Sequence, residues 1–161
     1  MQSSLGAKGE DDYKLKVGMT SDEIEWRLNE ALKEIPEAIG INNHQGSKAT
    51  TDGKVMGVVA SVLKQKNKIF LDSRTSSKTV GEKTMRTYGV PTARRHVFLD
   101  NELDIDKISQ QLEKLVKVSK KNGIAIGIGH VKSNTLKVLK EEIPKLSDKG
   151  YEFKFLSQVV N

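Results

Sequence analysis

The chain of 161 residues contains no cysteine and few aromatic residues. Without cysteine, the sequence excludes disulfides, thiolate metal ligands and thiol nucleophiles, although this absence fits a cytosolic and an exported protein equally well. No basic run interleaved with aromatic side chains is present to stack on bases, so the net charge of +6 is weak evidence for nucleic-acid binding. Most lysines instead alternate with acidic and apolar residues, as on solvated helix faces. We therefore expect no nucleic-acid partner.

Long apolar runs are also absent. No stretch approaches the roughly 20 apolar residues of a membrane span, and the opening residues, MQSSLGAKGEDDYK, lack the apolar core of a signal peptide. The sequence has no phosphate-binding loop, dinucleotide fingerprint or nucleophilic serine elbow. We expect residues 1–13 to form an irregular lead-in and residues 14–161 to form one α/β domain.

Helical and strand-like patterns alternate along that domain. Thr20 and Glu23 make a capping-box pattern at the start of an amphipathic helix, and Pro36 ends it. Amphipathic segments then separate short apolar runs, which we expect to be strands, near 38–42, 68–72, 95–99 and 124–128. This alternation predicts βα units with one parallel sheet. The clearest helix covers 104–123, where we expect Leu112 and Leu115 to be buried against the sheet.

Four of the strand-like runs end in a polar residue able to do chemistry, at intervals of 28, 28 and 30 residues: His44, Asp72, Asp100 and His130. The carboxyl ends of parallel strands meet at one edge of a sheet, so these side chains are expected to converge there. A single aspartate after a strand is more often a turn former or helix cap. Four polar residues in register favour a shared site.

The residue types at that edge allow metal-assisted hydrolysis but do not specify it. Histidine and aspartate ligate zinc, and histidine also transfers protons near neutral pH. Arg74 lies two residues after Asp72 and could orient its carboxylate or hold developing negative charge.

Four segments in order resemble the divergent polysaccharide deacetylase family: GINNHQGSKATTD, IFLDSRTSSKTV, YGVPTARRHVFLDN and AIGIGHVKSNTLKVL. The resemblance implies a distorted (β/α) barrel related to the NodB-like carbohydrate esterases. It also implies metal-dependent hydrolysis of acetyl groups on a polysaccharide, with a divalent metal that we expect to be zinc, and an extracellular or cell-envelope location.

The resemblance assigns roles to seven residues. It makes His130, Asp72 and Arg74 catalytic. It makes His44 a metal ligand, and it gives Asn43, Ser47 and Asp100 a substrate-binding role.

The sequence departs from the family pattern in three places. Residues 1–13 cannot supply the acidic pair of the family's early strands, so the chain resembles the later part of the domain. His96 stands where the family often has an acid, and Val131 follows His130 where the family often has proline. We therefore expect weak metal binding and self-association through an exposed sheet edge. The alternative is a non-catalytic glycan- or envelope-binding protein on the same scaffold.

Overall fold

The structure, a computed structural model, describes residues 1–3 and 13–160. The chain divides into two compact units: unit 1 comprises Met1–Arg94 with Val159–Asn161, and unit 2 comprises Arg95–Gln158. Most of the expected lead-in lies outside the described residues. Residues 1–3 are described and are hydrogen-bonded to the rest of unit 1: the backbone N–H of Gln2 donates to the Leu15 carbonyl at 2.8 Å.

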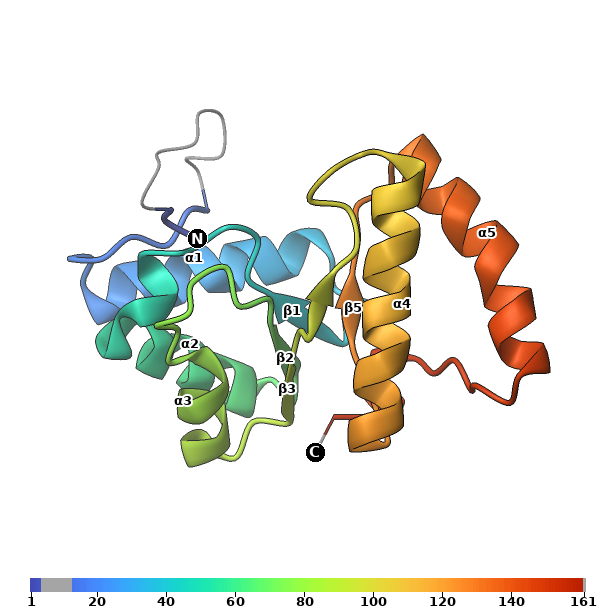
Figure 1. Cartoon of the computed structure of the whole chain (residues 1–161). Helices are drawn as coiled ribbons and strands as arrows, with labels where there is room; N and C mark the ends of the chain where they lie inside the picture. Colours follow the sequence, from blue (N-terminus) through green and yellow to red (C-terminus); the bar gives the residue numbers. More distant parts are fainter. Residues whose placement is uncertain (4–12, 161) are drawn as a thin grey trace. The chain divides into compact units, whose positions relative to one another are not determined.

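Unit 1 contains a three-stranded parallel sheet in the order β1–β2–β3 and three α-helices beside it (Figure 1). Gly40 pairs with Ile69 and Phe70 pairs with Thr92, so the three strands run in register. The elements along the chain are α1 (Ser21–Glu34), β1 (Gly40–Asn42), the 3-10 turn η1 (Ala49–Thr51), α2 (Gly53–Gln65), β2 (Ile69–Asp72), α3 (Gly81–Tyr88) and β3 (Thr92–Arg94).

Local signals explain where these helices begin. The capping box is confirmed, because the Glu23 backbone N–H donates to the Thr20 hydroxyl and the Thr20 N–H donates to the Glu23 carboxylate. The Asp52 carboxylate caps α2 through the Val55 N–H. α1 packs on α2 and α2 packs on α3. Their apolar faces bury one core, which includes Ile24, Leu28, Val55, Met56, Val59, Leu63, Phe70 and Met85.

Unit 2 contains β4 (Val97–Phe98), α4 (Ile105–Asn122), β5 (Gly127–Ile128), α5 (Ser133–Asp148) and the 3-10 turn η2 (Leu156–Gln158). β4 and β5 are parallel, and α4 packs against β4 and α5. The Asp104 carboxylate caps α4, and Gly123 ends it with a left-handed φ of 78°. The buried core is small and consists of Val97, Leu99, Ile108, Leu112 and Val138.

The parallel α/β architecture is confirmed, but the single continuous sheet is not. In the described residues, the strand pairs form a three-stranded and a two-stranded sheet. The sequence also missed β3, which follows Pro91 and is only three residues long. Residues 151–155 alternate apolar and polar side chains, as a half-buried strand would, but they form no strand. Phe153 and Phe155 are instead 51% and 80% exposed.

Helix length and apolar content do not permit a membrane span for any helix in the described part of the chain. Within the three-stranded sheet, β1 and β3 are the edge strands. Self-association through such an edge stays a prediction.

Leu112 offers a test of the unit 2 core. It is buried as expected, whereas Leu115 is only half-buried. We expect Leu112→Ala to lower the free energy of unfolding by about 2–5 kcal/mol, because it removes buried methyl groups and leaves a cavity. Urea unfolding followed by circular dichroism would measure the loss. Leu136→Ala on α5 is the matched control, because Leu136 is 50% exposed. Equal losses in the two variants would contradict the assigned core face of α4.

Candidate functional site

The carboxyl ends of β1 and β2 are joined by the side chain of Asn43. Asn43 is 1% exposed, and its Oδ1 accepts from the Ser73 backbone N–H at 2.7 Å. Its Nδ2 donates to the Gln45 carbonyl at 3.0 Å and to the Thr75 hydroxyl at 3.3 Å. Asn43 was predicted to bind substrate, but burial and these bonds suit it to holding two loops together.

His44 and Ser47 lie in the loop that Asn43 anchors. Gln45 and Gly46 have left-handed φ values of 54° and 84°, so the chain turns sharply directly after His44. His44 is exposed, and its carbonyl accepts from the Met1 amino group at 3.4 Å. The Ser47 hydroxyl lies 3.4 Å from that of Ser3. The structure thus places the His44 side chain at the surface near the end of β1.

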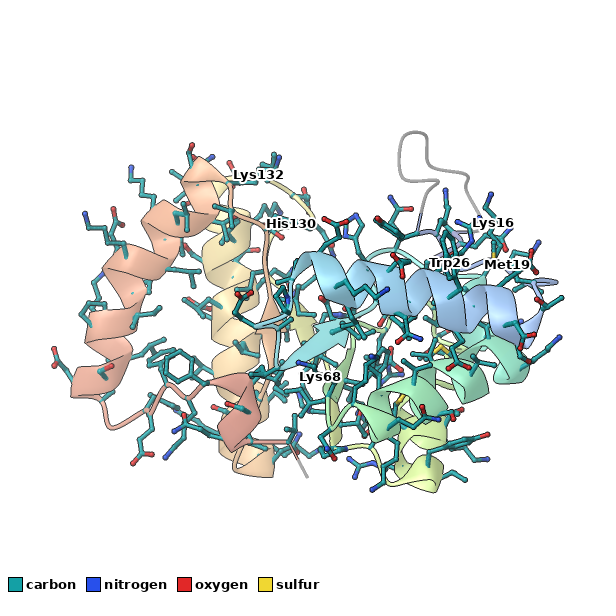
Figure 2. The ribbon with its side chains drawn as sticks, turned by 180° about the vertical axis from the view of Figure 1, so that it is seen from behind. Lys16, Met19, Trp26, Lys68, His130 and Lys132 are labelled. Carbon is teal, nitrogen blue, oxygen red and sulfur yellow. The ribbon has the colours of Figure 1, made fainter. Side chains whose placement is uncertain are left out.

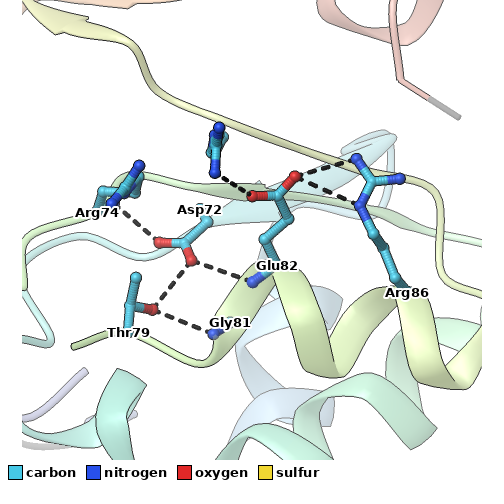
Figure 3. Close-up of polar contacts among 7 residues, drawn as sticks. Asp72, Arg74, Thr79, Gly81, Glu82 and Arg86 are labelled. Carbon is cyan, nitrogen blue, oxygen red and sulfur yellow. Dashed lines mark hydrogen bonds and ion pairs between the residues drawn. The ribbon is translucent and has the colours of Figure 1, made fainter. Parts of the chain in front are cut away.

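Asp72, the last residue of β2, holds the start of α3. Its side chain is buried, with 1% exposure for the residue. Figure 3 shows its carboxylate accepting three hydrogen bonds: Oδ1 from the Arg74 backbone N–H at 2.8 Å, and Oδ2 from the Thr79 hydroxyl at 2.9 Å and the Glu82 backbone N–H at 3.1 Å. The last bond satisfies an N–H in the first turn of α3, where helices leave donors unpaired.

Arg74 does contact Asp72, but through its main chain. The sequence predicted a contact from the guanidinium group, whereas the bond in the structure comes from the Arg74 backbone N–H. Arg74 has a φ of 49°, a left-handed conformation that is uncommon for a residue with a side chain. The acceptor on Asp72 therefore helps to hold a strained backbone at the carboxyl end of β2.

Gly81 at the first residue of α3 lies directly against this carboxylate. A Cβ at Gly81 would lie 2.7 Å from Asp72 Oδ2 and 3.1 Å from its Cγ, whereas a Cβ at Gly53, the first residue of α2, would meet nothing within 4 Å.

We expect Gly81→Ala to destabilise unit 1 by about 1–3 kcal/mol. Gly53→Ala should be neutral or stabilising by up to about 1 kcal/mol. The single tryptophan, Trp26, lies in α1 of unit 1, so urea unfolding followed by its fluorescence can compare the variants. Equal effects would contradict the close packing at Asp72.

In unit 2, Asp100 and His130 form a buried-to-exposed pair. The His130 Nδ1 lies 3.0 Å from Asp100 Oδ1, and the two side chains are 55% and 1% exposed, respectively. Asp100 Oδ2 also accepts from the His130 backbone N–H and from the Thr135 hydroxyl, the latter at 2.9 Å. Figure 2 shows His130 beside the start of α5, close to Lys132. The pairing confirms that these two strand ends meet.

The hydrogen bonds to Asp100 favour its charged form. Burial alone raises the pKa of this carboxyl group, but the bonds from the His130 backbone, the His130 imidazole and the Thr135 hydroxyl outweigh it, and the pKa lies below its ordinary value. Asp100 is therefore an anionic acceptor for His130 at neutral pH.

Asp100 should make the unfolding free energy of unit 2 depend on pH in the acidic range. Since its folded pKa is depressed, its contribution is complete above the unfolded value, near 3.8, and is lost as the pH falls through the folded value. We expect the stability difference between the wild type and Asp100→Asn to be largest near neutral pH and to shrink below about pH 4. Urea unfolding across this range would measure it, with Glu113→Gln on the exposed face of α4 as the control. A difference independent of pH would contradict the charged-state assignment.

The structure brings five of the seven predicted residues together in two groups. Asn43, Asp72 and Arg74 belong to one hydrogen-bonded region of unit 1, and Asp100 and His130 belong to unit 2. The expectation of one rim shared by both groups stays a prediction. Within either unit, no three His, Asp or Glu residues of the described chain are grouped as a metal site would require.

Sequence reasoning missed two hydroxyl residues, Thr79 and Thr135. Each donates to the buried carboxylate of its unit, from seven and 35 residues away, respectively. Thr135 is itself 1% exposed. Both lie near the start of a helix that follows a strand end, and this position was the one available signal.

Comparison with known proteins gives consistent matches. The model of the family described as divergent polysaccharide deacetylase matches residues 1–160. An uncharacterized protein of Haemophilus influenzae is 36% identical over 138 residues, which are 86% of this chain and 49% of that protein. The uncharacterized protein YibQ of Escherichia coli K12 is 36% identical over 132 residues, which are 82% of this chain and 41% of that protein. The chain thus spans about half the length or less of these relatives.

A solved structure supports the fold. The crystal structure of the uncharacterized protein ATU2773 from Agrobacterium tumefaciens C58 matches with a TM-score of 0.86 over 89% of this chain and 58% of that chain. The two sequences are 20% identical over the match, so the likeness concerns the fold.

Proposed function

The chain belongs to the divergent polysaccharide deacetylase family, and from this membership we propose that it takes part in hydrolysing acetyl groups on a glycan. The substrate is then a polysaccharide, and the place of action is the cell envelope or the extracellular space. The Asp100–His130 pair is the observation that carries the proposal, because it joins a charged, buried carboxylate to an exposed imidazole.

The geometry suits His130 to proton transfer. Asp100 is an acceptor, so the bond at 3.0 Å requires the proton on Nδ1 of a neutral His130. Nε2 is then the atom that takes up or delivers a proton, and the carboxylate holds the ring in that tautomer and orientation. In glycan deacetylation, His130 Nε2–H of the imidazolium would protonate the departing sugar nitrogen or oxygen. Asp100 would thus position the catalytic residue.

The residues of unit 1 take a different part in this proposal. The Asp72 carboxylate already accepts three hydrogen bonds within the chain, which suits it to a structural role. We assign Asp72 and Asn43 to holding the loops after β2 and β1. Arg74, His44 and Ser47 remain the residues of unit 1 proposed to meet the glycan or a metal.

A divalent metal, expected to be zinc, would activate water and polarise the acetyl oxygen. Tight catalytic zinc sites use three protein ligands and a water. His44 is an accessible donor, but the described residues of neither unit supply a group of three. The donor set of each unit alone does not fit such a site.

The same observation favours the second candidate function, a glycan- or envelope-binding protein without catalysis. The scaffold would be retained, and the loops after β1 and β2 would contact the sugar. Metal content separates the two candidates, because stoichiometric zinc supports the enzyme.

The test combines elemental analysis with an assay for acetate released from acetylated chitin- and peptidoglycan-type oligomers, in the presence of zinc. Release above a protein-free control, saturating with oligomer, supports the deacetylase. Saturable oligomer binding without acetate release supports the binding protein. If the chain neither binds the oligomers nor releases acetate from them, both proposed functions are wrong. Size-exclusion chromatography of the same sample tests the expected self-association.

A further inference from the structure

The amino end of the β4–β5 ladder is closed by a side chain. His96 precedes β4, and its backbone N–H donates to the Ile126 carbonyl at 2.8 Å. The Ile126 N–H in turn donates to the His96 ring nitrogen Nδ1 at 2.9 Å. In a longer parallel ladder, a backbone carbonyl would accept the latter N–H. The His96 imidazole therefore takes the place of a carbonyl and extends the ladder by one bond.

This role fixes the chemical state of the ring. Nδ1 can accept a hydrogen bond only when it carries no proton, so His96 must be neutral with its proton on Nε2. At His130, by contrast, the partner is the charged Asp100 carboxylate, which accepts only if the proton of a neutral ring is on Nδ1. The two histidines of unit 2 thus adopt opposite tautomers, each set by its partner.

The carboxyl end of the same ladder is closed by Asp100, which bonds the His130 backbone and ring. Both side-chain links join residues 30 positions apart in sequence. Between them the paired strands contribute two residues each, so few backbone bonds define their register. A slip by one residue would move His130 by about 3.3 Å along the strand and turn its side chain to the other face.

We propose that His96 is a positioning residue for His130. Its neutral imidazole holds β5 in register with β4, and that register sets the His130 ring against Asp100. The inference rests on the proposed proton-transfer role of His130 for its functional meaning. Its structural content is independent of catalysis and can be tested without substrate.

The experiment uses nuclear magnetic resonance on the whole chain and on three variants. His96→Phe keeps a planar ring without an acceptor, and His96→Asn puts an amide oxygen near the place of Nδ1. Ser109→Ala is the control, because it removes a hydrogen bond inside α4. We expect His96→Phe to speed hydrogen exchange of the Ile126 amide by about tenfold, the ratio that corresponds to about 1.4 kcal/mol. The ring ¹⁵N signals of His130 should move in the same variant.

His96→Asn should restore both readouts toward the wild type, and Ser109→Ala should change neither. In the wild type, long-range ¹H–¹⁵N spectra should show His96 with an unprotonated Nδ1. A proton on that atom, or unchanged Ile126 exchange and His130 signals in His96→Phe, would overturn the proposal. If His96→Phe does not fold, the wild-type tautomer and His96→Asn still decide. These NMR readouts do not depend on catalysis, so they test the role of His96 even if the chain has no deacetylase activity.

Discussion

Replacing His130 with glutamine is expected to lower kcat for acetate release by at least about 100-fold, because general acid–base catalysis typically contributes a factor of 10²–10⁴. Glutamine keeps a polar side chain of similar reach but cannot act as a general acid or base at neutral pH. In the proposed deacetylation the substitution leaves the other sugar contacts in place, so KM should change little. Steady-state kinetics on the acetylated oligomer would separate the two constants.

Two further variants sharpen this result. Asp100→Asn should lower kcat less than His130→Gln, because it removes the charge that orients the ring and leaves the ring itself. Lys137→Gln on the exposed side of α5 should leave both constants unchanged, because Lys137 belongs to neither group. Full activity in His130→Gln would refute the proton-transfer role of His130 but would leave the deacetylase function standing.

Replacing Asp72 with alanine is expected to lower the unfolding free energy of unit 1 by about 3–5 kcal/mol. The change leaves the partly buried donors on Arg74, Thr79 and Glu82 without this acceptor, and a donor that is left unsatisfied away from water costs about 1–3 kcal/mol. Water reaching the cavity would reduce the loss. Urea unfolding followed by Trp26 fluorescence reports on this unit.

The control for this change is Asp22→Ala in the first turn of α1. Asp22 is exposed, and its interaction with the helix dipole is worth less than about 1 kcal/mol. The loss of unfolding free energy in Asp72→Asn should fall between those of the two variants. The amide oxygen of asparagine can still accept from Thr79 and Glu82, whereas its NH2 group faces the Arg74 N–H and cannot accept. A loss below 1 kcal/mol in Asp72→Ala would show that these donors find water instead, and Asp72 would return as a candidate for chemistry.

The α/β fold could be predicted because its signals are local. The capping box at Thr20, the caps at Asp52 and Asp104, and the apolar face that carries Leu112 each need only neighbouring residues. β3 and the division into two sheets could not be predicted, because strands of two or three residues carry too little pattern. Their pairing depends on tertiary contacts.

For the candidate site, position was predictable and role was not. The spacing of Asp100 and His130 predicted that their strand ends meet, and the structure shows the bond. Asp72 fits the same pattern and Asn43 directly precedes His44, but both are buried and bonded within the chain. Strand-end spacing does not reveal which polar side chain turns inward, because that depends on donors such as Thr79 and Thr135 on the following helices.

The Asp72 contacts also bear on the order in which unit 1 folds. Their partners lie two, seven and ten residues away in sequence, whereas Asn43 bonds Ser73 and Thr75 across 30 and 32 residues. Closing a short loop costs less chain entropy than closing a long one. The β2–α3 corner can therefore form in the folding transition state before the link to β1. Stopped-flow kinetics of Asp72→Ala should then show slower folding with little change in unfolding rate, and a change confined to unfolding would place this corner late.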